Sequence, residues 1–273
     1  MEIIQIFQIS ALLIGTLAGA TTDYKTGYIY DWITIPMIII GIGLSALAGQ
    51  WNNLLIGAAI FGGLYIFYWA GKIGGGDVKI FTAIALLNPF NNYEFLLSAA
   101  FFAAIGAIIF YSTYYVLKYS KKGINWRENK NGLKQATLLG ILLIAYFTIG
   151  TFYGILNELS IITLGFPLFC GLIFFAFQKG IRKKFFIKKI SISKLEEDEV
   201  ISVEENPEKV LKIFKLGGAM AKGVIGEKEI EKLKKAGVKN VYVLRDLPPF
   251  GPFIFIGTAL ALAAPNFMTM LLI

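Results

Sequence analysis

The chain has 273 residues, a net charge of +8 and a strongly apolar composition. Hydrophobic residues make up 56%, and the 29 glycines bring the apolar fraction to about 67%, against about 45–50% in soluble domains. Only 16% of the residues are charged, which excludes a disordered chain, a coiled coil and an ordinary soluble enzyme. Histidine is absent and Cys170 is the single cysteine, so a Ser-His triad, a His-ligated metal and a cysteine cluster are excluded. Catalysis by this chain would use carboxylates, hydroxyls, Lys, Tyr or the backbone, and we expect no metal or other cofactor.

The charged residues are concentrated late in the chain. Residues 1–178 carry 16 charged side chains, and residues 179–249 carry 28. We therefore predict a membrane-embedded helical bundle at 1–178, a soluble domain at 179–249 and a C-terminal transmembrane helix at 250–273. The N-terminal apolar run follows Met1-Glu2 without a basic region, which favours a membrane span over a removable signal peptide.

Apolar runs of about 20 residues are long enough to span a bilayer. In chain order, the runs of this kind are Ile3–Thr21, Trp32–Ala48, Leu54–Ala70, Phe95–Leu117, Ala136–Leu156, Ile161–Phe177 and Phe250–Ile273. One further run, Val78–Leu87, is shorter and would rise only about 15–18 Å as a helix, roughly half of the hydrocarbon thickness. A segment of that length must be tilted, buried in protein, or reached through non-helical backbone at membrane depth.

The basic residues indicate how the chain crosses the membrane. If the short run counts as a crossing, all 26 Lys and Arg fall on one side, and the other side carries only Glu2, Glu94 and Glu158. The positive-inside rule makes the basic side cytoplasmic and places both termini outside. The predicted fold is a polytopic α-helical membrane protein of about eight helical segments, one of them short. A small cytoplasmic α/β domain is inserted before the last helix.

The soluble block shows strand and helix patterns. Val200–Val203 and Val241–Leu244 resemble strands, and Glu227–Lys235 resembles an exposed helix that ends at Gly237. We interpret Phe185–Ile190 as a juxtamembrane anchor. The 17 basic residues of the block suit contact with anionic lipid headgroups, whereas interspersed acids argue against nucleic-acid binding.

Two features of the chain allow both a structural and a functional interpretation. Gly15 and Gly19 form a small-xxx-small pair that is typical of helix packing in membranes. The acidic stretch 196–199, together with Glu204 and Glu205, is either a solvated face of the soluble domain or a surface that attracts a basic substrate segment.

Three aspartates lie at the cytoplasmic ends of predicted spans. Asp23 follows the first span, where a negative charge opposes the helix macrodipole and costs about 0.3–1 kcal/mol, so capping does not explain it. Asp31 precedes the second span, where an N-cap role is the simplest interpretation. Asp77 follows three consecutive glycines, residues 74–76, and is either another N-cap or a functional acid beside a glycine-lined channel. The glycines match neither a P-loop nor a dinucleotide-binding turn.

The run Gly74-x-Gly76-Asp77, followed by Val78-Lys79, resembles the GxGD signature of the membrane aspartyl proteases that process type IV prepilins. That family also carries an aspartate at the cytoplasmic end of an earlier helix, a second one eight residues later, and then an Ile-Pro or Leu-Pro pair. Asp23, Asp31 and Ile35-Pro36 reproduce this spacing. The resemblance covers about the first 90 residues. With one cysteine and no four-cysteine N-terminal segment, the chain resembles the archaeal branch, which cleaves preflagellins (prearchaellins) or other type IV pilin-like precursors.

The resemblance implies site residues and a reaction. Asp23 and Asp77 correspond to the catalytic pair, and Asp31 and Lys79 are structural or substrate-binding neighbours, together with Gly74, Gly75 and Gly76. The implied activity is an aspartic endopeptidase at the cytoplasmic face of the cell membrane, where an aspartate dyad activates water. Its partners would be archaellin or type IV pilin-like precursors and the lipid bilayer. The oligomeric state stays open.

Other functions compete with this interpretation. A presenilin-like protease would have its Tyr-Asp pair inside a helix and a later Pro-Ala-Leu motif, which this chain lacks. An ion- or proton-coupled transporter could use the same aspartates as relay groups, but would favour acids near mid-membrane and internal repeats. A non-enzymatic assembly protein would tolerate the loss of both aspartates.

Overall fold

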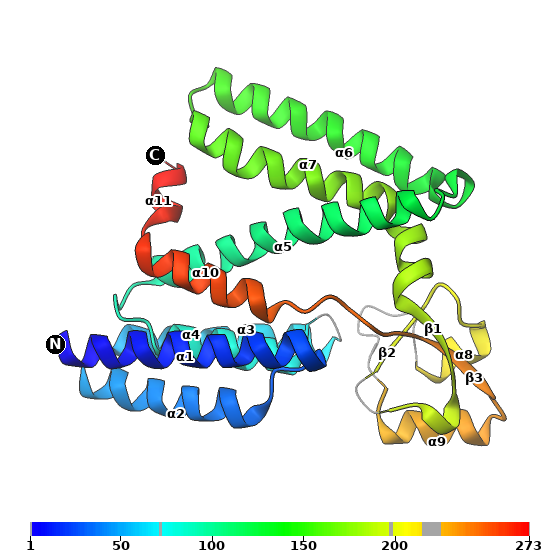
Figure 1. Ribbon diagram of the computed structural model, residues 1–273, viewed down its shortest axis with the longest axis horizontal. Coiled ribbons are helices and arrows are strands. Elements are labelled where there is room, and N and C mark those ends of the chain that lie inside the picture. Colours follow the sequence, from blue (N-terminus) through cyan, green and yellow to red (C-terminus); the bar gives the residue numbers. More distant parts are fainter. Residues whose placement is uncertain (1, 71–72, 197–198, 215–224, 273) are drawn as a thin grey trace.

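The computed structural model describes residues 2–70, 73–196, 199–214 and 225–272 (Figure 1). Lys72, one of the basic residues assigned to the cytoplasmic side, and residues 197–198 of the acidic stretch lie outside these ranges. The described part of the chain is mostly helical, with a small sheet at one end of the molecule (Figure 1).

The N-terminal half of the membrane part is built around its shortest helix. The four helices here are α1 (Glu2–Thr26), α2 (Asp31–Leu47), α3 (Trp51–Trp69) and α4 (Gly75–Leu86). Helix α4 packs against α2 and α3 and also touches α1, and most of its side chains are fully buried. Its apolar residues therefore face other helices instead of lipid, so the short run found in the sequence is a core helix buried in protein.

Buried polar side chains donate hydrogen bonds to the backbone carbonyls where α4 ends. The hydroxyl of Ser45 donates to the carbonyl of Leu86 at 2.6 Å, and the amide of Asn53 donates to the carbonyl of Asn88 at 2.7 Å. Gln8 from α1 donates to Gln50 at 2.6 Å in the same region. Unpaired carbonyls at the end of a helix are costly away from water, and these side chains take the place of water. This network allows α4 to end inside the bundle.

The second half of the membrane part consists of long helices that begin at asparagine caps. These are α5 (Tyr93–Lys121), α6 (Trp126–Phe152) and α7 (Glu158–Ile181). Their N-caps are Asn92, Asn125 and Asn157, and each side chain accepts a hydrogen bond from a backbone N–H in the first turn. Helix α7 packs between α5 and α6, and it continues past the domain boundary predicted after residue 178.

The C-terminal apolar run does not form the single predicted helix 250–273. It forms α10 (Gly251–Ala263), which packs along α5 and α1, and then a separate α11 (Phe267–Leu272). Pro265 lies between the two helices; it has no N–H to donate, and it disfavours helical backbone at Ala264. The segment predicted to be a soluble domain, which we call the soluble part, is therefore followed by two described helices, not one.

Five helices of the described chain are long and apolar enough to span a membrane. They are Ile3–Thr26, Trp51–Trp69, Tyr93–Lys121, Trp126–Phe152 and Glu158–Phe186. Helices α2 and α10 are apolar but shorter. The chain is thus a multi-pass membrane protein, and the number of crossings stays a prediction.

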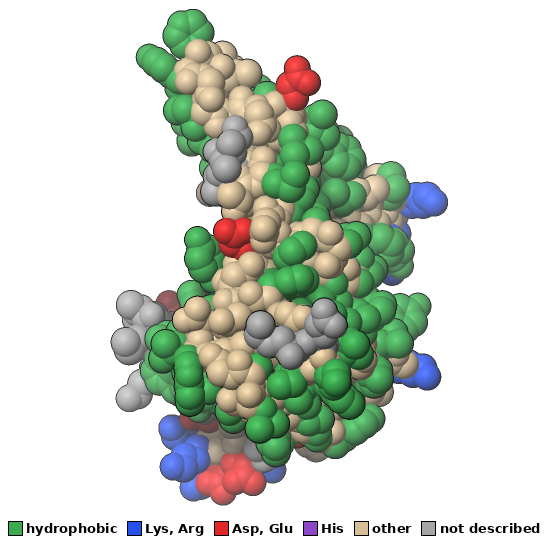
Figure 2. All heavy atoms as spheres, turned by 90° about the vertical axis from the view of Figure 1, so that its left-hand side faces the viewer, with side chains coloured by type: hydrophobic (Ala, Val, Ile, Leu, Met, Phe, Trp, Pro, Cys, Tyr) green, Lys and Arg blue, Asp and Glu red, His purple; other side chains and the backbone are tan. Residues whose placement is uncertain are grey.

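The soluble part and the two termini lie at opposite ends of the molecule (Figure 1). The small sheet stands at the end where α5 and α7 finish and α6 begins. Figure 2 shows the opposite end, where hydrophobic side chains cover much of the visible surface and basic side chains appear only at its periphery. This arrangement agrees with the separation of charge that the sequence predicts.

The soluble part contains a three-stranded antiparallel sheet in the order β1-β3-β2. Its elements are the π-helical turn η1 (Arg182–Phe186), β1 (Ile187–Ser191), the 3-10 turn η2 (Ile192–Lys194), β2 (Val200–Ile201), α8 (Glu208–Ile213), α9 (Glu227–Lys235) and β3 (Asn240–Leu244). Helix α9 has the predicted bounds, and the two predicted strands are present, although β2 is shorter than expected. The interpretation of Phe185–Ile190 as a membrane anchor is wrong, because Ile187–Ser191 pairs with β3. Lysines at 188 and 189 hide the strand pattern in the sequence.

The acidic residues of this part pair with its own cations. Glu199 binds Arg245, Glu204 binds Arg182 at 3.1 Å, and Glu205 binds Lys183 at 3.2 Å. The pairs of Glu204 and Glu205 join the loop after β2 to η1 at the end of α7, whereas the pair of Glu199 and Arg245 joins residues beside β2 and β3. Glu204 and Glu205 are partly exposed, whereas only 9% of the Glu199 side chain is exposed, so the described acids do not form one solvated face. Their ion pairs within the chain argue against a free surface that attracts basic segments.

Candidate active site

Asp23 lies within the last turns of α1, which continues to Thr26 instead of ending at the predicted Thr21. Gly27, with φ +74°, provides the left-handed residue that ends the helix. The Asp23 side chain is buried, with 7% of the residue exposed, and its Oδ2 accepts a hydrogen bond of 2.6 Å from the backbone N–H of Gly251. A buried carboxylate at the C-terminal end of a helix is unfavourable on its own. The N-terminus of α10 compensates for it by supplying an N–H donor.

Asp77 lies in the first turn of α4, two residues after the start of the helix. The predicted N-cap role is therefore wrong for Asp77, because Gly74 is the N-cap, and the Asp77 carboxylate lies against the backbone of Gly74. This position resembles the acidic member of a capping box, in which a side chain reaches back to the N-cap backbone. As a whole residue Asp77 is partly exposed, whereas Asp23 is buried.

The glycines before Asp77 allow close packing at the start of α4. A Cβ atom on Gly76 would lie 2.8 Å from both Cβ and the carbonyl oxygen of Ile29, in the connection between α1 and α2. A Cβ atom on Gly75 would lie 3.3 Å from the ring of Tyr68 on α3. Gly75 and Gly76 belong to α4 itself and not to the connection before it.

The two aspartates lie at the same level of neighbouring helices. Gly19 precedes Asp23 by about one turn of α1, and Ile80 follows Asp77 by about one turn of α4. A Cβ atom on Gly19 would lie 2.9 Å from Cδ1 of Ile80, so the two helices touch one turn below both carboxylates. The ends of α1 and α4 that carry Asp23 and Asp77 therefore lie side by side. The fold thus brings together two acids that are 54 residues apart in sequence.

Asp31 and Lys79 form an ion pair beside these acids. Lys79 Nζ lies 2.5 Å from Asp31 Oδ1, with side-chain exposures of 31% and 60%. The N-cap role predicted for Asp31 is wrong, because α2 begins at Asp31 itself and Tyr30 occupies the cap position without a side-chain bond. The pair joins the first turn of α2 to the first turn of α4.

Sequence reasoning missed two residues that lie near Asp23. One is Gly251, described above. The other is Tyr111 on α5, whose hydroxyl donates a hydrogen bond of 2.5 Å to the carbonyl of Pro249, two residues before Gly251. The run Pro248-Pro249-Phe250-Gly251-Pro252 was a signal for Gly251, since a glycine set between prolines at a helix start indicates a close backbone approach. Tyr111 has no comparable signal.

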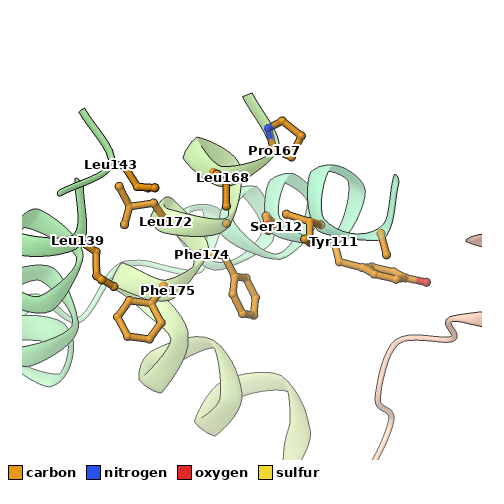
Figure 3. Close-up of a pocket in the computed structure, with 12 residues that line it drawn as sticks. Tyr111, Ser112, Leu139, Leu143, Pro167, Leu168, Leu172, Phe174 and Phe175 are labelled. Carbon is orange, nitrogen blue, oxygen red and sulfur yellow. The ribbon is translucent and has the colours of Figure 1, made fainter. Parts of the chain in front are cut away.

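A cavity of about 570 Å³ lies between α5, α6 and α7 (Figure 3). Its lining is almost entirely apolar and includes neither aspartate. Tyr111 lies at its edge, and in Figure 3 the Tyr111 ring extends away from the other labelled side chains. The cavity is therefore separate from the paired acids.

The helices and the paired acids define a multi-pass membrane protein with two aspartates at one end of its bundle. Residues 10–114 match the model of the type IV leader peptidase family. The matched region contains Asp23, Asp31 and the segment 74–79. It ends within α5, so it does not include α6, α7 or the soluble part.

The curated relative found is prepilin peptidase EppA from Methanothermobacter thermautotrophicus (strain Delta H). The two sequences are 31% identical over 108 residues, which cover 35% of this chain and 28% of that protein. The match therefore spans less than a third of the relative's length. No solved structure matches the chain significantly.

Proposed function

We propose that this protein is a membrane aspartic endopeptidase that removes leader peptides from archaellin or type IV pilin-like precursors. The family match and the similarity to an archaeal prepilin peptidase support a peptidase of this class. The observation that carries the aspartic mechanism is the packing of α1 against α4, with Asp23 and Asp77 at the same end of the two helices.

The proposed mechanism uses one proton shared between the two carboxylates. Like charges at close range cannot both stay ionised, so one aspartate holds a proton and the other does not. The ionised aspartate takes a proton from a water molecule as it attacks the scissile carbonyl. The protonated aspartate donates a hydrogen bond to the carbonyl oxygen, on which negative charge develops.

The position of Asp23 and Asp77 indicates which kind of precursor the site would accept. In the eight-segment topology the Lys and Arg lie on the same side as Asp23 and Asp77, and the positive-inside rule supports a cytoplasmic position for that side. A site at this boundary suits a precursor that has a short basic leader followed by a long apolar helix. Cleavage would then occur at the junction between the two.

The test is a cleavage assay on the full chain in liposomes with several candidate precursors. Either Asp23→Asn or Asp77→Asn should reduce the cleavage rate by about 10²–10⁴-fold, because each removes one partner of the proton transfer. Both variants keep nearly the same side-chain volume, so similar yields of folded membrane protein are expected.

Asp246→Asn is the matched control. Asp246 lies in the soluble part, its side chain is exposed, and its backbone has φ +57°, a conformation that asparagine adopts readily. This variant should cleave the precursor at the rate of the unchanged protein. Normal cleavage by Asp23→Asn would contradict the dyad, and proton uptake coupled to solute movement would favour the transporter instead.

A further inference from the structure

The chain that leaves the soluble part contacts Asp23 at the point where α10 begins. Gly251, the first residue of α10, directs its N–H to Asp23 Oδ2 at 2.6 Å. Both Gly251 and Asp23 are buried, so water does not compete for this bond. The orientation of the Asp23 carboxylate therefore depends on where the backbone of Gly251 lies.

Gly251 fits this place because it has no side chain. A Cβ atom there would lie 2.9 Å from Cβ of Asp23 and 3.1 Å from Cα of Ala20. Contacts of this length with backbone atoms of α1 cannot be relieved by turning a side chain. The start of α10 therefore rests against α1, with its N–H within hydrogen-bond distance of the carboxylate.

Tyr111 holds the same segment from the opposite side. Its hydroxyl donates to the carbonyl of Pro249 at 2.5 Å, two residues before Gly251. Its ring packs edge-on against Phe253, two residues after Gly251, with the ring centroids 5.2 Å apart. Figure 3 shows the Tyr111 hydroxyl directed away from the cavity. Tyr111 thus contacts the chain on both sides of the residue that binds Asp23.

We propose that Tyr111 and Gly251 are positioning residues for Asp23: Tyr111 fixes the segment 249–253, and Gly251 fixes the carboxylate. This inference rests on the proposed function, in which Asp23 reacts with water or substrate. Small errors in the placement of a reacting group cost large factors in rate. Because Gly251 contacts the enzyme's own carboxylate and Tyr111 contacts the residues on both sides of Gly251, their loss should lower kcat and leave KM nearly unchanged.

The first experiment compares Tyr111→Phe with Tyr114→Phe in the full chain in liposomes. Tyr114 is on the same helix, is exposed, and has its hydroxyl 3.2 Å from Lys118 Nζ. Tyr114→Phe therefore also removes one tyrosine hydroxyl from α5, but not the one that binds Pro249. We expect Tyr111→Phe to lower kcat about ten- to hundredfold with KM within about twofold, and Tyr114→Phe to change neither. A raised KM with normal kcat, or normal values of both, would overturn the inference.

A second measurement does not depend on peptidase activity. A water-soluble carbodiimide with an amine nucleophile labels accessible carboxyl groups, and mass spectrometry locates the label on Asp23 and Asp77. Tyr111→Phe should increase the labelling rate of Asp23 severalfold and leave that of Asp77 unchanged, because only Asp23 is covered by Gly251. Equal labelling of Asp23 in Tyr111→Phe and the unchanged protein would contradict the inference.

The outcomes separate the inference from the function on which it rests. If Asp23→Asn and Asp77→Asn abolish cleavage while Tyr111→Phe retains normal kcat and normal labelling, the peptidase proposal stands and the positioning role is wrong. If the aspartate variants cleave normally, the peptidase mechanism is wrong, and the labelling experiment still decides whether Tyr111 holds the segment over Asp23.

Discussion

At the scale of single residues, Gly76 links the helix that carries Asp77 to the connection between α1 and α2. Gly76→Ala would force its Cβ against Cβ and the carbonyl oxygen of Ile29, and a shift of α4 that relieved this contact would also move Asp77. We expect a loss of about 1–3 kcal/mol in the free energy of unfolding, together with lower peptidase activity. Thermal unfolding in detergent and the cleavage assay measure the two effects.

Gly63→Ala is the control for this prediction. Gly63 lies in α3, and a Cβ atom there would meet no atom within 4 Å. This variant should be neutral or about 0.5–1 kcal/mol more stable, because alanine loses less backbone entropy in a helix. Equal destabilisation by both variants would mean that glycine flexibility, and not the contact with Ile29, is what Gly76 provides.

The ion pair of Asp31 and Lys79 is a second case at this scale. Both side chains are substantially exposed, so solvent screens their attraction. A double-mutant cycle with Asp31→Asn and Lys79→Met should give a coupling of about 0.2–1 kcal/mol in the free energy of unfolding. We also expect each single variant to retain most of its peptidase activity. A complete loss of cleavage in Asp31→Asn would instead make Asp31 part of the reacting group.

At the scale of elements, the short helix α4 depends on the polar side chains that surround its C-terminal end. Asn53→Ala removes the donor to the carbonyl of Asn88 and leaves a buried acceptor unpaired. We expect a loss of about 1–3 kcal/mol in the free energy of unfolding. Asn52→Ala, at the exposed neighbouring position, should stay within about 0.5 kcal/mol. Thermal unfolding of both variants in detergent tests this role, and equal stabilities would refute it.

Elements were predictable where their signal is local. The spans follow from apolar length, and α9 follows from its charge pattern and the glycine after it. The break between α10 and α11 was missed because the length of an apolar run does not show whether the run forms one helix or two. Pro265, which lies at the break, was the signal for it. Strand β1 was missed because an edge strand with two adjacent lysines lacks the alternation of a half-buried strand.

The site was predictable only in part, for a related reason. Asp23 and Asp77 were identifiable because acids are rare in this membrane part and their spacing resembles that of a known family. Gly251 and Tyr111 come near Asp23 only through the packing of α10 between α1 and α5, a contact between distant segments of the chain. No local pattern indicates which side chain will lie beside another across such an interface.

At the scale of the whole molecule, the separation of charge predicts the orientation in the membrane, and Cys170 makes it testable. Replacing this single cysteine by serine gives a background for Lys121→Cys, at the basic end, and Tyr153→Cys, at the other end. In intact cells, a membrane-impermeant thiol reagent should label only Tyr153→Cys, because Lys and Arg are retained on the cytoplasmic side. Lys121→Cys should be labelled only after the membrane is permeabilised. The reverse pattern would place Asp23 and Asp77 outside the cell, where they could not meet a leader peptide before the precursor crosses the membrane.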